Sequence, residues 1–163
     1  MIQPALFSSA NPAWCTPPSV LYLVSQVLGP VGLDPCSNPQ SIVGAAEEWS
    51  LETSQDGLAP NWGSYGPVYV NPPYGRGAID QWAAKIALEG AFGVELIALL
   101  PARVDTSWFR AVWTARAVCF WSGRIKFLGA ESGAPFPSAL PYWGGHVDRF
   151  CEVFSAAGKV LVL

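Results

Sequence analysis

Apolar residues recur along this chain with two different spacings, and the two spacings alternate. Residues 17–29 place valines and leucines three and four positions apart, as one face of an amphipathic helix requires. Thr16 is placed to cap this helix with Pro17 at its first position, and Gly29 is suited to end it. Residues 78–90 repeat the helical spacing and again stop at a glycine. The pattern therefore predicts two well-defined helices in the first 90 residues.

Short apolar runs lie between and after these helices, and they predict strands. The runs occupy residues 31–34, 67–70, 94–101 and 117–121. The run at 94–101 is apolar almost throughout, which favours a strand buried on both faces of a parallel sheet. Two or three more short strands are expected after residue 124.

Three further segments are expected to be helical. They lie near residues 41–49, from Asp105 or Thr106 to about Thr114, and around residues 147–156. Strands and helices in this alternation predict an α/β fold with a doubly wound, mostly parallel sheet. No repeat or long linker divides the sequence, so residues 1–163 are expected to form a single domain, with residues 1–13 as a candidate flexible N-terminus.

The composition agrees with a folded domain. Hydrophobic residues make up 51% of the chain and charged residues 13%, which favours a substantial core over extensive disorder. No apolar run approaches the roughly 18 to 20 residues that span a membrane. The N-terminus lacks a positive region followed by a long apolar stretch, which argues against secretion and favours a cytoplasmic location.

Cysteine and histidine are too scattered to predict a metal site. Cys15, Cys36, Cys119 and Cys151 include no pair with C-x-x-C spacing, and His146 is the single histidine. Structural zinc sites combine such pairs with further cysteine or histidine ligands. The sequence therefore predicts no metal and no redox motif, and it favours free thiols in a reducing cytoplasm.

Positive charge is concentrated in one part of a chain whose net charge is −3. Residues 1–100 hold two basic and eight acidic side chains, whereas residues 101–130 hold five basic and one acidic. Such a local excess can contact phosphates, although an ordinary solvated surface gives the same signal. The candidate phosphate contacts are Arg76, Arg103, Arg110, Arg116, Arg124 and Lys126.

The stretch VNPPYG at residues 70–75 follows an apolar strand and cannot continue it. Each proline fixes φ and lacks an N–H, so the segment is expected to be a stiff, extended loop. It is expected at the carboxyl edge of the sheet, where doubly wound folds bind ligands. There the Asn71 side-chain oxygen and the Pro72 carbonyl can accept hydrogen bonds from one amino group, while Pro73 keeps their spacing and Tyr74 offers a flat stacking face.

Two acceptors aimed at one amino group suit a particular chemistry. The lone pair of an exocyclic amine is delocalised into its ring, so the nitrogen is a poor nucleophile. Acceptors on both N–H groups favour a pyramidal nitrogen and free the lone pair for attack. No covalent enzyme intermediate is required, which fits the scarcity of cysteine and histidine. The alternative is a proline-rich turn with a packed tyrosine.

Five short motifs occur in a fixed order between Trp14 and Trp143. They are WCTPPSVLYLVSQVLGPVGLDPCSNP, DGLAPNW, VNPPYG, LLPARVDTSWF and GRIKF. Together they resemble the phage-type DNA N6-adenine methyltransferases, and the ordered set is far more specific than NPPY alone. The resemblance implies the fold of the S-adenosylmethionine-dependent methyltransferases. It also implies methyl transfer to N6 of adenine in DNA, on a flipped or unpaired base, inside a bacterial host cell.

The resemblance also assigns roles to individual residues. It implies that Asn71, Pro72, Pro73 and Tyr74 hold the target adenine, with Tyr74 stacked on the base. The implied S-adenosylmethionine contacts are Thr16, Pro17, Asp34, Pro35, Cys36, Asp56, Gly57 and Leu58. Pro101, Arg103, Asp105 and Thr106 match a loop on the same edge of the sheet. One departure is that DPCSNP replaces the glycine-rich loop usual after the first strand of methyltransferases.

Several alternatives remain open at this point. Asp34 and Asp56 each begin an ordinary turn dipeptide, so both could serve the backbone alone. NPPY also serves enzymes that methylate adenine in RNA or glutamine in proteins, and a non-catalytic nucleic-acid- or cofactor-binding domain is a further reading. The sheet needs most of the residues after Gly75, so no separate target-recognition domain is expected and sequence specificity should be short or loose.

Overall fold

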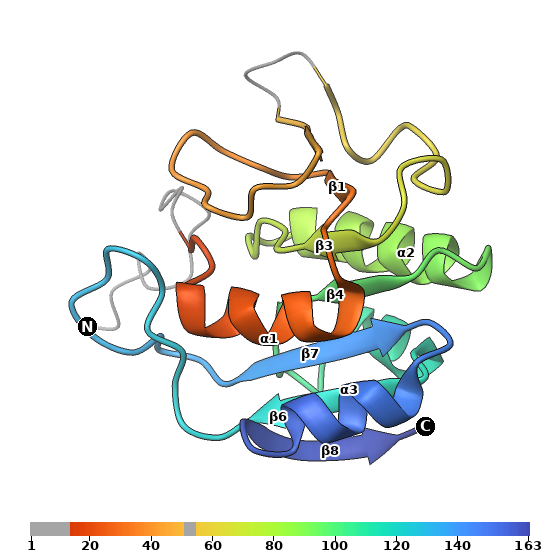
Figure 1. Cartoon of the computed structure of the whole chain (residues 1–163). Helices are drawn as coiled ribbons and strands as arrows, with labels where there is room; N and C mark the ends of the chain where they lie inside the picture. Colours follow the sequence, from red (N-terminus) through yellow and green to blue (C-terminus); the bar gives the residue numbers. More distant parts are fainter. Residues whose placement is uncertain (1–13, 51–54) are drawn as a thin grey trace.

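The computed structural model describes residues 14–50 and 55–163. These residues form one eight-stranded sheet in the order β2-β1-β3-β4-β7-β6-β8, with β5 also paired to β7 (Figure 1). The strands are β1 (Leu33–Asp34), β2 (Glu47–Glu48), β3 (Val68–Val70), β4 (Leu96–Ala98), β5 (Leu100–Pro101), β6 (Ala117–Trp121), β7 (Ser138–Trp143) and β8 (Gly158–Val162). The helices are α1 (Pro18–Leu28), α2 (Ala78–Ala91), the 3-10 helix η3 (Trp108–Thr114) and α3 (Val147–Phe154).

The sheet is mixed, and this corrects the expected mostly parallel, doubly wound arrangement. Strands β2, β1, β3 and β4 pair in parallel, whereas β7 runs antiparallel to β4, β5 and β6, and β8 runs antiparallel to β6. The reason lies in residues 122–137, which form no helix between β6 and β7. A parallel return requires a crossover, commonly a helix, so β7 returns beside β6 in the opposite direction.

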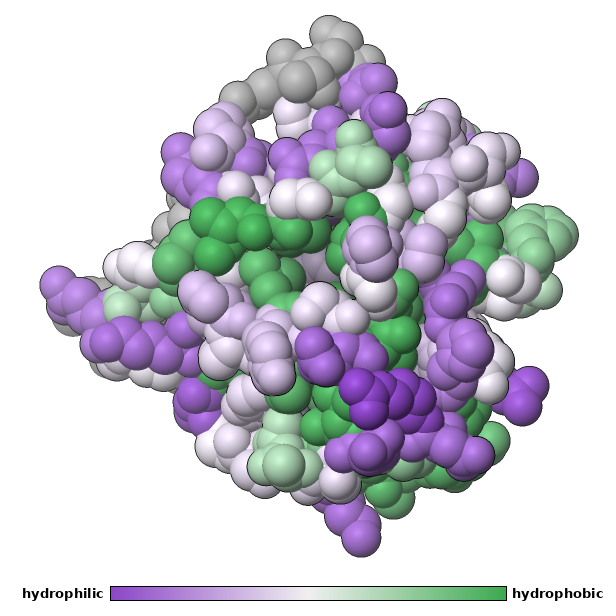
Figure 2. Space-filling view, in the orientation of Figure 1, coloured by the Kyte–Doolittle hydropathy of each residue, from purple (hydrophilic) through white to green (hydrophobic). Residues whose placement is uncertain are grey.

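Helices cover both faces of the sheet. In Figure 1, α1 and α3 lie on the near face, and α2 and η3 lie behind it. The near face buries Val20, Val24 and Phe150, and the far face buries Trp82 and Phe109. Hydrophilic side chains gather over α3 on the exposed side of the near face (Figure 2).

The helices expected at residues 17–29, 78–90 and 147–156 are confirmed as α1, α2 and α3, with corrections at their ends. Gly90 does not stop α2, because the helix continues to Ala91 and Phe92 is its C-cap residue. Gly29 ends α1 with a φ of 69°, as expected. However, Pro17 rather than Thr16 is the N-cap residue, because the Thr16 hydroxyl bonds elsewhere. The helix expected from Asp105 or Thr106 to about Thr114 is the 3-10 helix η3. Its N-cap residue is Ser107, so neither Asp105 nor Thr106 caps it.

The short helix expected near residues 41–49 is wrong. The backbone there pairs with β1 instead: Glu47 N–H donates to the Gly32 carbonyl at 3.0 Å, and Trp49 N–H donates to the Asp34 carbonyl at 2.9 Å. Pairing with the free edge of β1 therefore decided the structure of residues 47–49, although their sequence has a weak helical pattern. In the described part of the chain, no helix combines the length and apolar character needed to cross a bilayer.

Candidate active site

Two of the sequence motifs meet at the carboxyl edge of the parallel half of the sheet. Strands β1 and β3 are parallel neighbours with Leu33 opposite Val68, so the segments that follow them leave the sheet side by side. Asp34 ends β1, and Asn71 directly follows β3. The Cys36 sulfur interacts with the backbone amide of Asn71, which links the two segments directly.

A pocket of about 250 Å³ lies beside this junction. Its walls come from the segment after β1, from the chain around residues 55–58, and from α2 and the motif loop. They include five residues implied as cofactor contacts, together with Pro73 of the NPPY motif: Pro35, Cys36, Asp56, Gly57 and Leu58. Residues separated by about twenty positions in the sequence are thus brought to one cavity.

Gly57 explains how closely the pocket walls approach each other. A Cβ atom at this position would lie 1.9 Å from the Pro35 carbonyl oxygen and 2.9 Å from the Trp82 ring. Only glycine therefore fits between the two walls. The neighbouring Asp56 carboxylate accepts the Leu58 N–H at 3.0 Å, so the turn reading of Asp56 has direct structural support.

Asp34 is an acid held in an apolar setting. It is 4% exposed and accepts a hydrogen bond from the Cys36 N–H at 3.1 Å. Burial is the main cause that raises the pKa of this carboxyl from 3.8 to about 7, and the nearby Glu48 raises it further, against the lowering effect of its hydrogen bonds. A cationic group brought close to Asp34 would favour the ionised carboxylate.

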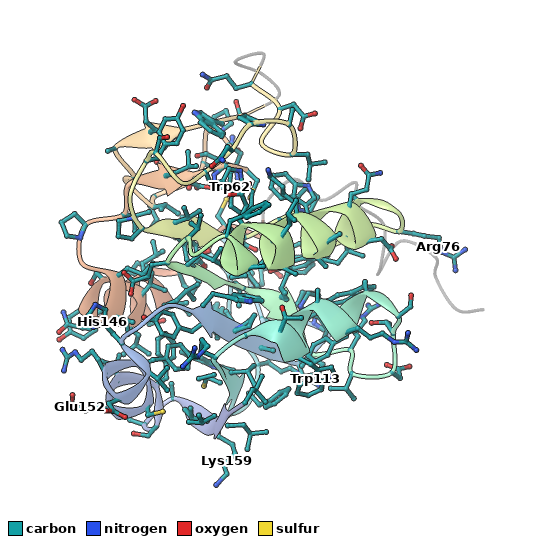
Figure 3. All side chains as sticks on the ribbon, turned by 90° about the vertical axis from the view of Figure 1, so that its right-hand side faces the viewer. Trp62, Arg76, Trp113, His146, Glu152 and Lys159 are labelled. Atoms are coloured by element: carbon teal, nitrogen blue, oxygen red, sulfur yellow. The ribbon has the colours of Figure 1, made fainter. Side chains whose placement is uncertain are left out.

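A buried ion pair on α2 anchors one pocket wall, and the sequence analysis missed it. Lys85 donates to Glu89 at 2.5 Å and to the Pro60 carbonyl at 2.7 Å, while Glu89 accepts the Trp62 N–H at 3.1 Å. The Trp62 indole donates to the Gly57 carbonyl at 2.9 Å, and Figure 3 shows Trp62 between its loop and α2. The only signal in the sequence was a lysine followed four positions later by a glutamate, a pattern more typical of a solvated helix face.

The Asn71 carboxamide has a protein partner at each polar atom. Its nitrogen donates to the Trp14 carbonyl at 2.5 Å and to the Thr16 hydroxyl at 3.1 Å. Its oxygen accepts the Tyr74 hydroxyl at 2.5 Å, and that hydroxyl also lies 3.0 Å from the Leu99 carbonyl. A carboxamide oxygen has two lone pairs, so Asn71 retains acceptor capacity beyond Tyr74.

Tyr74 is half-buried and packs into the core on one side. Its ring meets Phe136 edge-on at a centroid distance of 5.5 Å. Burial raises the pKa of the phenol well above its ordinary value, so Tyr74 remains a neutral donor. Pro72 is buried and Pro73 is exposed, which gives the loop one face against the protein and one face toward the pocket.

Comparison with known proteins places this arrangement in a family. The family model of the DNA N-6-adenine-methyltransferases (Dam) matches residues 5–139. The chain belongs to the Dam family. A curated Dam relative, the DNA N-6-adenine-methyltransferase of Escherichia phage T1, is 27% identical, and the match covers 74% of this chain but 55% of the relative. The family resemblance read from the motifs is therefore confirmed.

Four of the six candidate phosphate contacts of this Dam-family chain lie at the carboxyl edge of the sheet, and two lie elsewhere. Strand β6 is antiparallel to β7, which is antiparallel to β4, so β6 points the same way as β4 and ends at the same edge. The segments that leave this edge carry Arg76, Arg103, Arg124 and Lys126, and Figure 3 shows Arg76 extending outward from the start of α2. Arg110 lies within η3, and Arg116 precedes β6 at the opposite edge.

The four cysteines of this Dam-family chain are free thiols. Across the ranges 14–50 and 55–163, no three or more histidine, cysteine, aspartate or glutamate side chains gather in a group that could hold a metal.

Proposed function

We propose that this chain transfers a methyl group from S-adenosylmethionine to N6 of adenine in DNA, in the cytoplasm of a bacterial host. The observation that carries the proposal is the junction of two motif loops beside one pocket. The NPPY loop follows β3 and the DPC segment follows β1, and both border the same cavity in a chain of the Dam family.

The pocket suits the proposed methyl donor. S-adenosylmethionine is an electrophile that supplies the methyl group from a positively charged sulfonium. Asp34 directly precedes the pocket residue Pro35, and its buried carboxyl would attract a positive charge once it is ionised. The proposed contacts in the pocket are Pro35, Cys36, Asp56, Gly57 and Leu58. Pro17, the N-cap residue of α1, is not among the residues that line it.

Asn71 and Pro72 are the proposed acceptors for the amino group of the target adenine. Asn71 offers its remaining lone pair, and the Tyr74 hydroxyl has the Leu99 carbonyl as a second acceptor. Tyr74 can therefore shift toward Leu99 when the amine arrives, and no buried donor loses its partner. Acceptors fixed in advance stabilise the developing positive charge on the nitrogen without reorganisation during the reaction.

The carboxyl edge that holds the motif loops also carries positive charge. We propose that Arg76, Arg103, Arg124 and Lys126 contact DNA phosphates there, with Arg110 farther along η3. Phosphate contacts position a duplex or single strand without reading its sequence. The target base would enter from this edge, either rotated out of a duplex or already unpaired.

A transfer assay with labelled S-adenosylmethionine tests the proposal. The purified chain is offered DNA, RNA and a glutamine-containing protein in parallel, and the products are digested and identified by mass spectrometry. We expect label in N6-methyladenine from DNA. Label only in RNA or in protein glutamine would move the chemistry to the corresponding alternative substrate. Cofactor binding without transfer to any of the three would favour a non-catalytic domain.

A further inference from the structure

The orientation of the Asn71 carboxamide depends on a segment far away in the sequence. Trp14 and Thr16 precede α1, whereas Tyr69 and Asn71 belong to β3 and the loop that follows it. The Asn71 nitrogen donates to the Trp14 carbonyl at 2.5 Å and to the Thr16 hydroxyl at 3.1 Å. The Thr16 hydroxyl in turn lies 2.7 Å from the hydroxyl of Tyr69.

The contacts of Asn71 distinguish its nitrogen from its oxygen. If the carboxamide turned by half a rotation, the oxygen would face the Trp14 carbonyl, and two acceptors would meet without a proton between them. The nitrogen would then face the Tyr74 hydroxyl in place of the oxygen. The Asn71 nitrogen therefore faces two acceptors, the Trp14 carbonyl and the Thr16 hydroxyl, and the Asn71 oxygen is directed toward Tyr74. Thr16 supplies the only one of these two acceptors that belongs to a side chain.

Tyr69 holds the Thr16 hydroxyl from its other side. The Tyr69 ring is fully buried, and burial raises the pKa of its phenol far above the ordinary value, so the hydroxyl keeps its proton. Thr16 is 4% exposed, and its hydroxyl contacts the Tyr69 hydroxyl and the Asn71 side-chain nitrogen. This placement directs the hydroxyl to the motif loop, which differs from the cofactor contact that the family resemblance implies.

Resting on the proposed function, we propose that Thr16 is a positioning residue, whose hydroxyl, held by Tyr69, keeps the Asn71 oxygen turned toward the amino group of the target adenine. Thr16 touches neither the base nor the transferred methyl group in this role. It acts through Asn71, so its loss should lower the turnover of bound substrate more than the affinity for S-adenosylmethionine.

The Thr16→Val variant removes the hydroxyl and keeps the shape of the side chain. We expect kcat on DNA to fall roughly tenfold, because one hydrogen bond that orients Asn71 is lost. The affinity for S-adenosylmethionine, measured by calorimetry, should stay within about twofold of the wild type. Thr16→Ser keeps a hydroxyl and should restore most of kcat.

Two further variants separate positioning from general destabilisation. In Thr16→Val combined with Tyr69→Phe, both facing hydroxyls are gone, so thermal stability should recover while kcat stays low. Thr114→Val is the matched control, since Thr114 accepts the Trp143 indole N–H at 3.2 Å at the opposite edge of the sheet. This control should change stability without changing kcat.

A spectroscopic readout tests the same inference without any turnover. The side-chain NH₂ signals of Asn71, assigned by their absence in Asn71→Ala, should exchange slowly with solvent in the wild type and in Thr16→Ser, and faster in Thr16→Val. Unchanged signals in Thr16→Val would overturn the proposal even if no DNA is methylated. A loss of cofactor affinity in Thr16→Val with kcat unchanged would also overturn it, and would make Thr16 a cofactor contact.

Discussion

Asn71 enters the proposed reaction already oriented. Contacts from Trp14, Thr16 and Tyr74 engage its nitrogen and its oxygen before any base is present. An acceptor held in this way does not have to find its direction when the amine arrives, which lowers the entropic cost of reaching the transition state. The loss of this side chain should therefore affect the chemical step more than binding.

Asn71→Ala should lower kcat by about a hundredfold or more, because an acceptor aimed at the reacting nitrogen is removed. The affinity for S-adenosylmethionine should remain within about threefold, since the pocket residues are unchanged. Single-turnover kinetics and calorimetry measure the two quantities. Asn61→Ala is the control, because Asn61 is exposed and its carboxamide caps a turn at Gly63. A turnover near that of the wild type would remove Asn71 from the reaction.

Asp34 predicts a pH dependence whose direction follows from its raised pKa of about 7. In the unfolded chain this carboxyl loses its proton near pH 3.8, so in the ligand-free protein it lowers stability as pH rises from about 4 to about 7. A cationic ligand favours the ionised carboxylate. Binding of S-adenosylmethionine should therefore strengthen between pH 6 and pH 7.5 and release a proton.

Thermal unfolding with and without S-adenosylmethionine measures this effect. The stabilisation by the ligand should grow with pH over that window in the wild type. In Asp34→Asn the ligand should stabilise the protein less, and by an amount that no longer depends on pH. Equal stabilisation of the wild type at every pH would show that Asp34 does not sense the bound cation.

The sequence predicted some residues of the site because their signals are local. Two prolines after an apolar strand mark the NPPY loop, and the ordered motifs indicate the family. The contacts of Thr16 with Tyr69 and with Asn71 could not be predicted, because each joins positions more than 50 residues apart. No local periodicity encodes which polar group a remote hydroxyl meets.

At the scale of elements, α2 does more than cover the sheet. Its Lys85–Glu89 pair, with side chains 11% and 3% exposed, binds the backbone at Pro60 and Trp62. Trp62 then reaches Gly57 in the pocket wall. The helix therefore fixes the position of the segment that borders the proposed cofactor site.

Glu89→Gln should destabilise the protein by roughly 3 kcal/mol, because it leaves the Lys85 charge buried without its partner. It should also weaken cofactor binding, since the wall at Gly57 loses its support. Urea unfolding and calorimetry measure the two effects. Glu152→Gln is the matched control: its partner is Arg149, the pair is exposed, and little change is expected. Equal stability in both variants would contradict a stabilising role for the buried Lys85–Glu89 ion pair.

The elements themselves were predicted unevenly, for physical reasons. Strong helical spacing gave α1 and α2, and continuous apolar runs gave β3, β4 and β6. The run at 94–101 divides into β4 and β5, because β7 pairs with each of them separately. The direction of a strand depends on the connection that precedes it. The antiparallel pairing of β6 and β7 therefore reflects the helix-free connection at residues 122–137, and it could not be predicted from the sequences of the strands themselves.

At the scale of the whole molecule, the directions of the strands place most of the candidate phosphate contacts at one edge of the sheet. The carboxyl edge of β3, β4 and β6 leads into Arg76, Arg103 and Arg124, and the opposite edge carries Arg116. A net charge of −3 conceals this division. Nucleic acid should therefore meet one edge of the sheet.

Arg76→Ala should weaken DNA binding and reduce the slope of log K against log salt by about one, as expected for one phosphate contact. Fluorescence anisotropy over a salt series measures both quantities. Arg116→Ala removes the same charge at the far edge and should leave affinity and slope unchanged. Equal losses in the two variants would point to a diffuse attraction instead of a defined edge.

The position of β7 delays completion of the sheet while the chain is being synthesised. This strand is buried at all six positions and lies between β4 and β6, although it comes after both in the chain. While the ribosome has released only the residues through Pro101, one flank of β4 has no neighbour. The half of the sheet that carries the two motif loops is therefore completed only after β7 has been synthesised. A chaperone that covers the unpaired edge of β4 would act during that interval.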